Sequence, residues 1–340
     1  MSGQIECGEA AMRIDAFSLL VMILSSLSPA LGQETKALDL TETIAFANVQ
    51  GAFNHMSVDA LHQRLFAAAP ANKTVEVVDL KSGKRLRSLE SERPAAVRYT
   101  PEFNQLYVSS GQTLYIYDGE TLGLIASVDL ASRLDELQYD ARAKELYVGC
   151  MTSGRTAIAV ISVPEGKLVG KIPLPASPQG IVVEEGGARL FANVPNMRQV
   201  AVVDRRARRL LSPWPVGHVK ENTPIGLDEA HHRLFLGGRE PPRLVVLDTL
   251  SGKAVAQVPI DGFADDLSWD SARHRIYISC GDGFIDVIQQ QDADHYRPLG
   301  RVSTADGAAT STFSDQLNSL YVAIPRRGDT PAGIRVFKLQ

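Results

Sequence analysis

The sequence has little net charge and no strongly basic region. Its formal net charge is -4 and its isoelectric point is about 6.0. No cluster of lysine and arginine interleaved with aromatic residues is present, which argues against a nucleic-acid partner. The exception is the arginine-rich run at 204–209. We interpret it as a solvated turn between two strands, with a polyanion site as the alternative.

Motifs that mark familiar enzyme classes are also missing. The chain contains no CxxCH, HExxH or GxSxG motif, no Walker loop and no GxGxxG that opens a helix. The sequence therefore predicts no cofactor and no catalytic nucleophile. Its 44% hydrophobic and 22% charged residues, with 27 glycines and 18 prolines, are typical of a soluble globular protein rich in turns.

The N-terminal segment 1–32 has the features of a signal peptide. An apolar stretch of 12 residues, Ala16 to Leu27, follows Arg13 and precedes the small residues Ala30 and Gly32. It is short for a membrane span but suits the core of a cleaved leader. We expect cleavage before Gln33, with an uncleaved anchor as the alternative. Because residues 1–11 are acidic where a leader should be basic, Met12 is the better start.

One short signal recurs through the rest of the chain. An aliphatic residue followed by an aromatic one returns at spacings of 41, 40, 44, 44, 42 and 44 residues. The seven copies are Leu65-Phe66, Leu106-Tyr107, Leu146-Tyr147, Leu190-Phe191, Leu234-Phe235, Ile276-Tyr277 and Leu320-Tyr321. This period is that of a four-stranded propeller blade. The sequence predicts an all-β fold, a seven-bladed β-propeller with four-stranded antiparallel blades, formed by residues 33–340 as one domain.

Other positions keep phase with the pair. Six residues before it stand polar residues suited to a turn: Asp59, Thr100, Asp140, Glu184, Asp228, Asp270 and Ser314. The residues just before them alternate in polarity, as in a strand with one buried face. Cys150 and Cys280 occupy equivalent strands of repeats three apart, too distant for a disulfide, so we expect two buried free thiols.

The last repeat stops one strand short, and the missing strand is at the other end of the chain. Residues 43–59 align without gaps on residues 124–140, which places an outer strand before the first repeat. We expect it to pair with the C-terminal strand and close the ring.

The repeats resemble the YVTN-type β-propeller family, which includes YncE-like and surface-antigen proteins. The resemblance rests on LYVSS, LYVGC and LYVAI and on the turns VVDLKSGK and VLDTLSGK, and it covers about residues 41–340. The family's Thr-Asn ending is poorly kept, and Ala192-Asn193 comes nearest. The resemblance implies an exported, periplasmic or secreted protein, which agrees with the leader, and it implies no particular reaction.

In a propeller, the residues that enter each innermost strand surround the central channel. Three repeats place charged residues there, and other repeats add polar ones. The candidate ligand-binding residues are His55, Arg98, Asp135, Glu136, Gln179, Asp265 and Asp266. Two acidic pairs and a histidine would suit a divalent cation or a cationic ligand. The plainer interpretation is a wet polar rim, in which Arg98 neutralises a carboxylate and His55 is a solvated loop residue.

Three functions follow from this pattern. We favour a non-catalytic binding scaffold of the cell envelope, a monomer that presents its loops or channel mouth to a protein or small molecule. The first alternative is a hydrolase or lactonase with a metal or carboxylate site at the rim. The second is a propeller subunit of a periplasmic redox complex. Trp214 is either an exposed contact or, more in keeping with its setting, packed over a blade edge.

Overall fold

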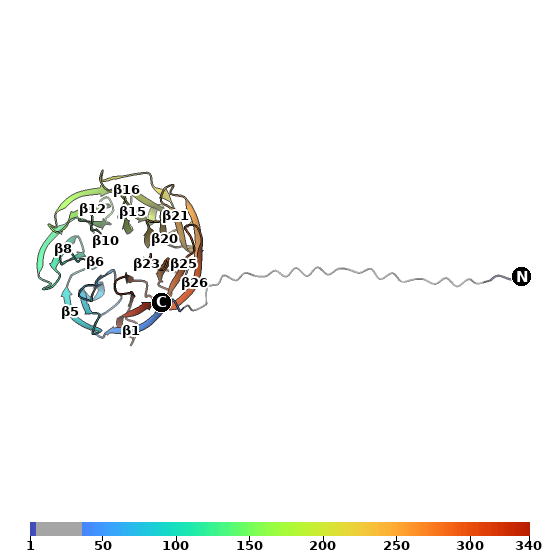
Figure 1. Ribbon diagram of the computed structural model, residues 1–340, viewed down its shortest axis with the longest axis horizontal. Helices are drawn as coiled ribbons and strands as arrows, with labels where there is room; N and C mark the ends of the chain where they lie inside the picture. The colour runs from blue at the N-terminus through green and yellow to red at the C-terminus, as the bar shows by residue number, and fades with distance from the viewer. Residues whose placement is uncertain (5–35) are drawn as a thin grey trace.

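A computed structural model describes residues 1–4 and 36–340 of the chain. The predicted leader, its cleavage site and the start at Met12 lie outside the described residues, apart from residues 1–4. The described part forms seven antiparallel sheets arranged as a ring of blades (Figure 1). This confirms the predicted seven-bladed propeller.

The blades are numbered one to seven by their innermost strands, which line the centre of the ring. These strands are β2 (Met56–Asp59), β6 (Pro94–Thr100), β10 (Leu134–Asp140), β14 (Gln179–Val183), β19 (Ile225–Asp228), β23 (Ala264–Asp270) and β27 (Ser311–Ser314). The second strands are β3 (Arg64–Ala69), β7 (Gln105–Ser110), β11 (Glu145–Cys150), β15 (Arg189–Val194), β20 (Arg233–Arg239), β24 (Arg275–Cys280) and β28 (Ser319–Ile324).

The outer two strands of each blade complete the sheets. The third strands are β4 (Thr74–Asp79), β8 (Thr113–Asp118), β12 (Ala157–Ser162), β16 (Gln199–Asp204), β21 (Pro242–Asp248), β25 (Phe284–Gln290) and β29 (Ala332–Leu339). The outermost strands are β5 (Lys84–Glu90), β9 (Leu124–Asp129), β13 (Leu168–Pro173), β17 (Arg209–Leu210) with β18 (Trp214–Pro215), β22 (Ala254–Pro259), β26 (Tyr296–Ser303) and β1 (Leu38–Phe46). Two 3-10 turns, η1 (Pro70–Asn72) and η2 (Pro195–Met197), follow β3 and β15.

The ring closes as the sequence predicts. Strand β1 is the outer strand of blade seven, where it pairs antiparallel with β29 over the registers Leu38 to Leu339 and Phe46 to Ala332. The C-terminus lies beside β1 (Figure 1). Pairing the two ends of the described domain leaves short blade edges on the outside of the disc.

The repeated aliphatic-aromatic pair builds the core between blades. In blade one, Leu65 packs in a cluster with Tyr321 and Ile334 of blade seven, whereas Phe66 packs with Leu106 of blade two. Because neighbouring side chains on a strand point to opposite faces, one residue of each pair faces the preceding blade and the other faces the following blade. All fourteen of these side chains are at most 2% exposed. Seven such clusters join the seven blades.

The turns between the first and second strands carry the predicted polar bonds. Asp59 Oδ1 accepts the backbone N–H of His62 at 3.1 Å, and its other oxygen accepts Arg64 Nη2 at 2.7 Å. Arg64 in turn donates from Nη1 to the carbonyl of Gly119 in blade two at 2.7 Å. In five blades the first residue of the second strand donates in this way to a backbone carbonyl of the following blade, through Arg64, Gln105, Arg189, Arg233 and Arg275. In blade three the residue at this position is Glu145, which accepts a hydrogen bond from Arg208 of blade four.

Two smaller predictions also fall within the described residues. Cys150 and Cys280 are buried free thiols, as predicted. Trp214 packs against Phe191 with ring centroids 5.2 Å apart, so it covers the edge of blade four. Within the described residues, no helix has the length and hydropathy needed to cross a bilayer.

Candidate functional site

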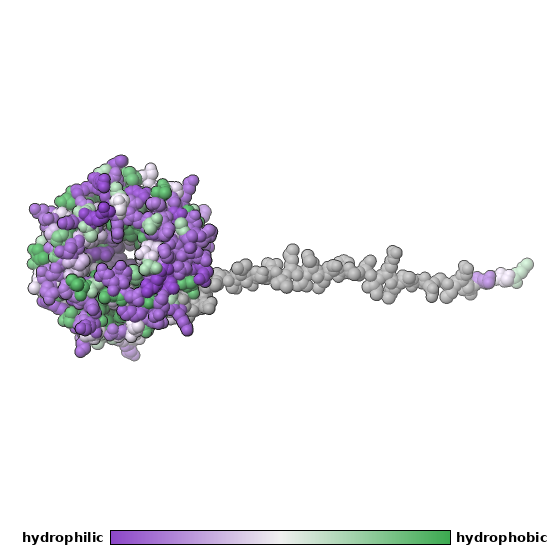
Figure 2. Space-filling view, viewed as in Figure 1, coloured by the Kyte–Doolittle hydropathy of each residue, from purple (hydrophilic) through white to green (hydrophobic). Residues whose placement is uncertain are grey.

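A cavity of about 480 Å³ lies along the central channel and is lined by residues from all seven innermost strands. The face of the disc in Figure 2 is largely hydrophilic and is hollowed at its centre. All seven candidate residues line this cavity: His55, Arg98, Asp135, Glu136, Gln179, Asp265 and Asp266. The sequence phase therefore placed these residues correctly around one channel.

Backbone bulges direct several of these side chains. The pairing of β10 with β11 shifts register between Leu134 and Leu137, and that of β23 with β24 shifts between Ala264 and Asp266. Bulges of this kind turn side chains at the rims of β structures. Both acidic pairs therefore stand at irregular positions of their strands, where the alternation of inward and outward residues is interrupted.

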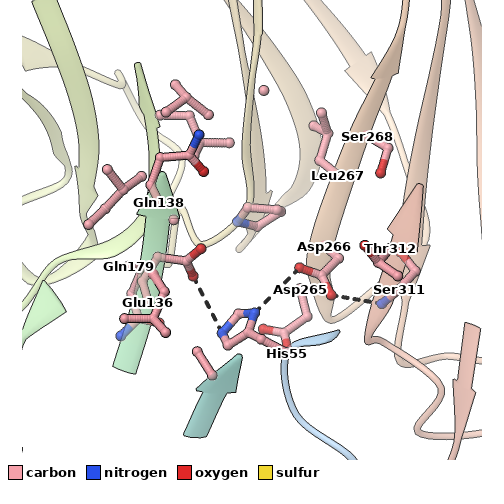
Figure 3. A pocket seen from close by; sticks show the side chains of 18 of the residues that line it. His55, Glu136, Gln138, Gln179, Asp265, Asp266, Leu267, Ser268, Ser311 and Thr312 are labelled. Atoms are coloured by element: carbon pink, nitrogen blue, oxygen red, sulfur yellow. Dashed lines mark hydrogen bonds and ion pairs between the residues drawn. The ribbon is translucent and has the colours of Figure 1, made fainter. Parts of the chain in front are cut away.

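His55 forms a link across the channel. Its Nε2 lies 3.4 Å from Glu136 Oε2, and its Nδ1 lies 3.9 Å from Asp266 Oδ1. The histidine belongs to blade one, whereas the two carboxylates come from blades three and six, on either side of it (Figure 3). A quarter or less of each of these three side chains is exposed. The three groups are thus held close together and are largely shielded from solvent.

Burial and charge act against each other in this cluster. Burial alone lowers the pKa of His55, but the carboxylates of Glu136, Asp266, Asp135 and Asp265 outweigh it and raise that pKa to about 9. Burial raises the pKa of Asp266 to about 7, with His55 only partly opposing the effect. Burial also raises the pKa of Glu136. At neutral pH the ring of His55 is an imidazolium between two carboxyl groups that ionise reluctantly.

Other contacts hold the surrounding groups. Asp266 Oδ2 accepts the backbone N–H of Ser311 at 2.7 Å. Arg239 pairs with Asp265 and also donates from Nε to the carbonyl of Ala264 at 2.9 Å. The sequence pattern does not predict Arg239, because this residue lies at the end of a second strand, whereas the predicted residues belong to the innermost strands and the segments that enter them.

Arg98 does not neutralise a carboxylate by direct contact. It donates from Nη2 to the carbonyl of Leu137 at 2.9 Å and to Gln138 Oε1 at 3.4 Å. Arg98 lies two residues beyond the position of its strand that opens onto the channel. The bulge before Leu137 leaves the carbonyl of Leu137 within reach of the Arg98 guanidinium group. Its charge interacts electrostatically with Glu136 and Asp266, so it offsets these carboxylates without a direct ion pair.

Asp135 makes the fewest side-chain contacts of the four carboxylates that line the cavity. Its backbone carbonyl accepts a hydrogen bond from Ser109 Oγ at 3.0 Å, but its side chain makes no hydrogen bond or ion pair with the described residues. Gln179 also lines the cavity without a side-chain hydrogen bond to any described residue. Both groups retain hydrogen-bonding capacity that faces the channel.

The predicted divalent-cation site has no geometric counterpart in the described chain. No group of three or more His, Cys, Asp or Glu side chains in residues 1–4 and 36–340 is arranged to hold a metal ion. The nearest set is His55 with Glu136 and Asp266, but both ring nitrogens of this histidine already face carboxylates. A metal would require one nitrogen to be free and unprotonated.

The arginine-rich run also has a structural role. Arg205 pairs with Asp140 of blade three and donates to the carbonyls of Glu184 and Gly187 at 2.6 and 2.7 Å. Arg208 donates from Nη2 to Glu145 Oε1 at 3.0 Å. The run forms a turn, as predicted, but these two arginines connect blades three and four instead of pointing into solvent.

Comparisons with known proteins assign the fold and no family. No family model matches the chain, and no curated protein matches it. Among solved structures, a chain of hydrazine synthase from Kuenenia stuttgartiensis has a TM-score of 0.73 and 17% identity, covering 87% of this chain and 99% of that one. A chain of a mitotic checkpoint complex has a TM-score of 0.75 and 14% identity, covering 100% and 98%. Matching chains number 1702, and identities this low show that this chain is similar to them in its seven-bladed propeller fold alone.

Proposed function

We propose that this protein is a non-catalytic binding module of the cell envelope that takes its ligand at the channel mouth. The observation that carries the proposal is the convergence of charged side chains from blades one, three and six on one cavity of about 480 Å³. A concave site of this size with a few convergent polar groups suits a small molecule or one side chain of a larger partner. Export rests on the leader-like segment, and membership of the YVTN-type family rests on the repeat motifs.

The charge of the mouth favours a ligand with a positively charged group. Four carboxylates line the cavity, where His55 and Arg98 are the cationic groups. Asp135 and Gln179 offer acceptors that the described residues leave unused. An ammonium or guanidinium group would find both charge and hydrogen-bond acceptors there.

The test is a binding screen with matched probes. Thermal shift or calorimetry would compare a diamine, arginine methyl ester, a neutral sugar and a dicarboxylate. We expect binding of the cationic probes, weakened about tenfold or more in Asp135→Asn because a charge-assisted hydrogen bond is lost. Asp292→Asn, which removes an exposed carboxylate in the loop between β25 and β26, is the matched control. Equal responses to all four probes, or none, would contradict the proposal.

A hydrolase of lactonase type is the second candidate. The pKa of Asp266, raised by burial to about 7, is suited to a group that exchanges protons near neutrality. Perturbed carboxyl groups in a cavity also occur in purely structural ion pairs. Turnover of lactone or ester substrates that is abolished in Asp266→Asn but retained in Asp292→Asn would favour this candidate over the binding module.

A subunit of a redox complex is the third candidate. Its support is the likeness of fold to a hydrazine synthase chain at 17% identity. Co-purification of the tagged protein from envelope extract with a cofactor-bearing chain would favour it, whereas recovery of the protein alone would favour the binding module.

A further inference from the structure

The strongest feature beyond the proposed function is the way in which one side chain spans the channel mouth. His55 belongs to blade one, but its ring contacts blades three and six, each two places away around the ring. Its backbone is fixed, because Asn54 N–H donates to Ala68 at 2.8 Å and Ala68 N–H donates to His55 at 3.3 Å. Any movement therefore falls to the side chain.

The contacts that hold the ring are charge contacts and not close hydrogen bonds. Distances of 3.4 Å and 3.9 Å lie beyond the usual range for a good N–H to oxygen bond. Such contacts depend mainly on the presence of charge on both sides. Each contact is lost when its carboxyl group takes up a proton, and both are lost when the ring loses one.

Every charged group around the ring must be considered. From β10 come Glu136 and Asp135, and from β23 come Asp266 and Asp265. Arg98 on β6 interacts electrostatically with both Glu136 and Asp266. Asp265 is already paired with Arg239. The two groups in direct contact with the ring, Glu136 and Asp266, therefore control it.

We propose that His55 is a crossbar of the channel mouth, closed while Glu136 and Asp266 are ionised and released when acid neutralises them. This regulation rests on the proposed function, since the crossbar lies in the cavity that a ligand would occupy. Acidification neutralises the two carboxyl groups with raised pKa values and removes both contacts of the imidazolium, and a charged ring that has lost its contacts moves toward water. The part of the cavity that the ring had spanned is then open to a ligand that binds through the unused acceptors of Asp135 and Gln179.

The test measures the motion of the ring in the ligand-free full chain. With selectively labelled histidine, relaxation of the ring carbon of His55 would be compared at about pH 8 and about pH 5.5, on either side of the pKa of about 7 of Asp266. His231, held to Asp228 with Nδ1 and Oδ2 2.8 Å apart, is the rigid reference. His218, exposed and without a described partner, is the mobile reference.

The expected result is a ring as rigid as that of His231 at the higher pH, with a relaxation rate at least about twofold lower at the lower pH. The double variant Glu136→Gln/Asp266→Asn should be mobile at both values. His55→Gln identifies the signal. A ring equally rigid at both values, or unchanged in the double variant, would overturn the crossbar.

Failure of this proposal and failure of the proposed function can be told apart, because the ring is observed without ligand. If the ring becomes mobile in acid but no cationic probe binds, only the proposed binding function is contradicted. If cationic probes bind but the mobility of the ring does not change with pH, only the crossbar is contradicted.

Discussion

Buried acids occur in two regions of this propeller, and they behave in opposite ways. Asp59, in a turn between a first and a second strand, is fully buried and is held by Arg64 and by the backbone of His62. Burial alone would raise its pKa, but those hydrogen bonds lower it below its usual range. Asp266, in the channel, receives one backbone N–H and a distant imidazolium, and burial raises its pKa to about 7.

The difference shows what each region contributes. In the turns of blades one and four, a buried acid pairs with the arginine that begins the second strand, and the same arginine donates to a carbonyl of the next blade, so the ion pair stabilises the junction between blades. At the channel mouth, the charges come from five blades and are incompletely matched. Incomplete matching of buried charges costs free energy of folding.

Removing the matched partner should give the largest effect. In Arg64→Met the carboxylate of Asp59 stays buried without its partner, so the free energy of unfolding should fall by about 3–5 kcal/mol. Urea denaturation at neutral pH measures this loss. Arg64→Met combined with Asp59→Asn should recover part of it. A loss below about 1 kcal/mol is what an exposed ion pair gives, and it would mean that the turn and the channel mouth do not differ in how strongly their charges are matched.

Removing the histidine should give a smaller effect that depends on pH. The pKa of His55 is raised from 6.5 to about 9 in the folded protein, so protonation of its ring stabilises the fold below pH 9 as long as the facing carboxyl groups are ionised, and this contribution is lost as the pH rises through 9. His55→Gln should therefore unfold more easily than wild type by about 1–2 kcal/mol near pH 8, and the two should converge near pH 10. If the free energies of unfolding of wild type and His55→Gln differ by the same amount at every pH, the raised pKa of His55 is contradicted.

Neutralising the mismatched acid should stabilise the protein. Because the pKa of Asp266 is higher in the folded than in the unfolded chain, its contribution is present below about 3.8 and is lost as the pH rises through 7. In Asp266→Asn the amide oxygen can still accept the N–H of Ser311, and the free energy of unfolding should rise by about 1 kcal/mol at pH 8. Thermal unfolding against pH checks this, and a less stable variant at pH 8 would contradict it.

The half-exposed pair at the mouth should give the smallest effect. Arg239 and Asp265 are 26% and 33% exposed, so water screens their attraction. Arg239→Gln should change the free energy of unfolding by less than about 1 kcal/mol. A loss near that of Arg64→Met would show that the ion pair at the mouth contributes as much to the free energy of unfolding as the buried pair in the turn.

The sequence was sufficient for the fold because the same local pattern occurs seven times. The pair Leu65-Phe66 and its six counterparts must each be buried against two neighbours, and this requirement gives the number of blades and the closure by β1. Phase within the repeat also identified the channel residues. Side chains at one position of every innermost strand must face the same axis.

Only the tertiary structure decided how those residues meet. The position of His55 between Glu136 and Asp266 depends on distances between blades that are two places apart in the ring. The bond of Arg98 to a carbonyl and the pairing of Arg239 with Asp265 depend on bulges and on how neighbouring blades meet. A repeat specifies a residue's direction because its backbone environment is copied. The partner of a charged group depends on which unlike blades face each other across the channel, and no local pattern encodes that.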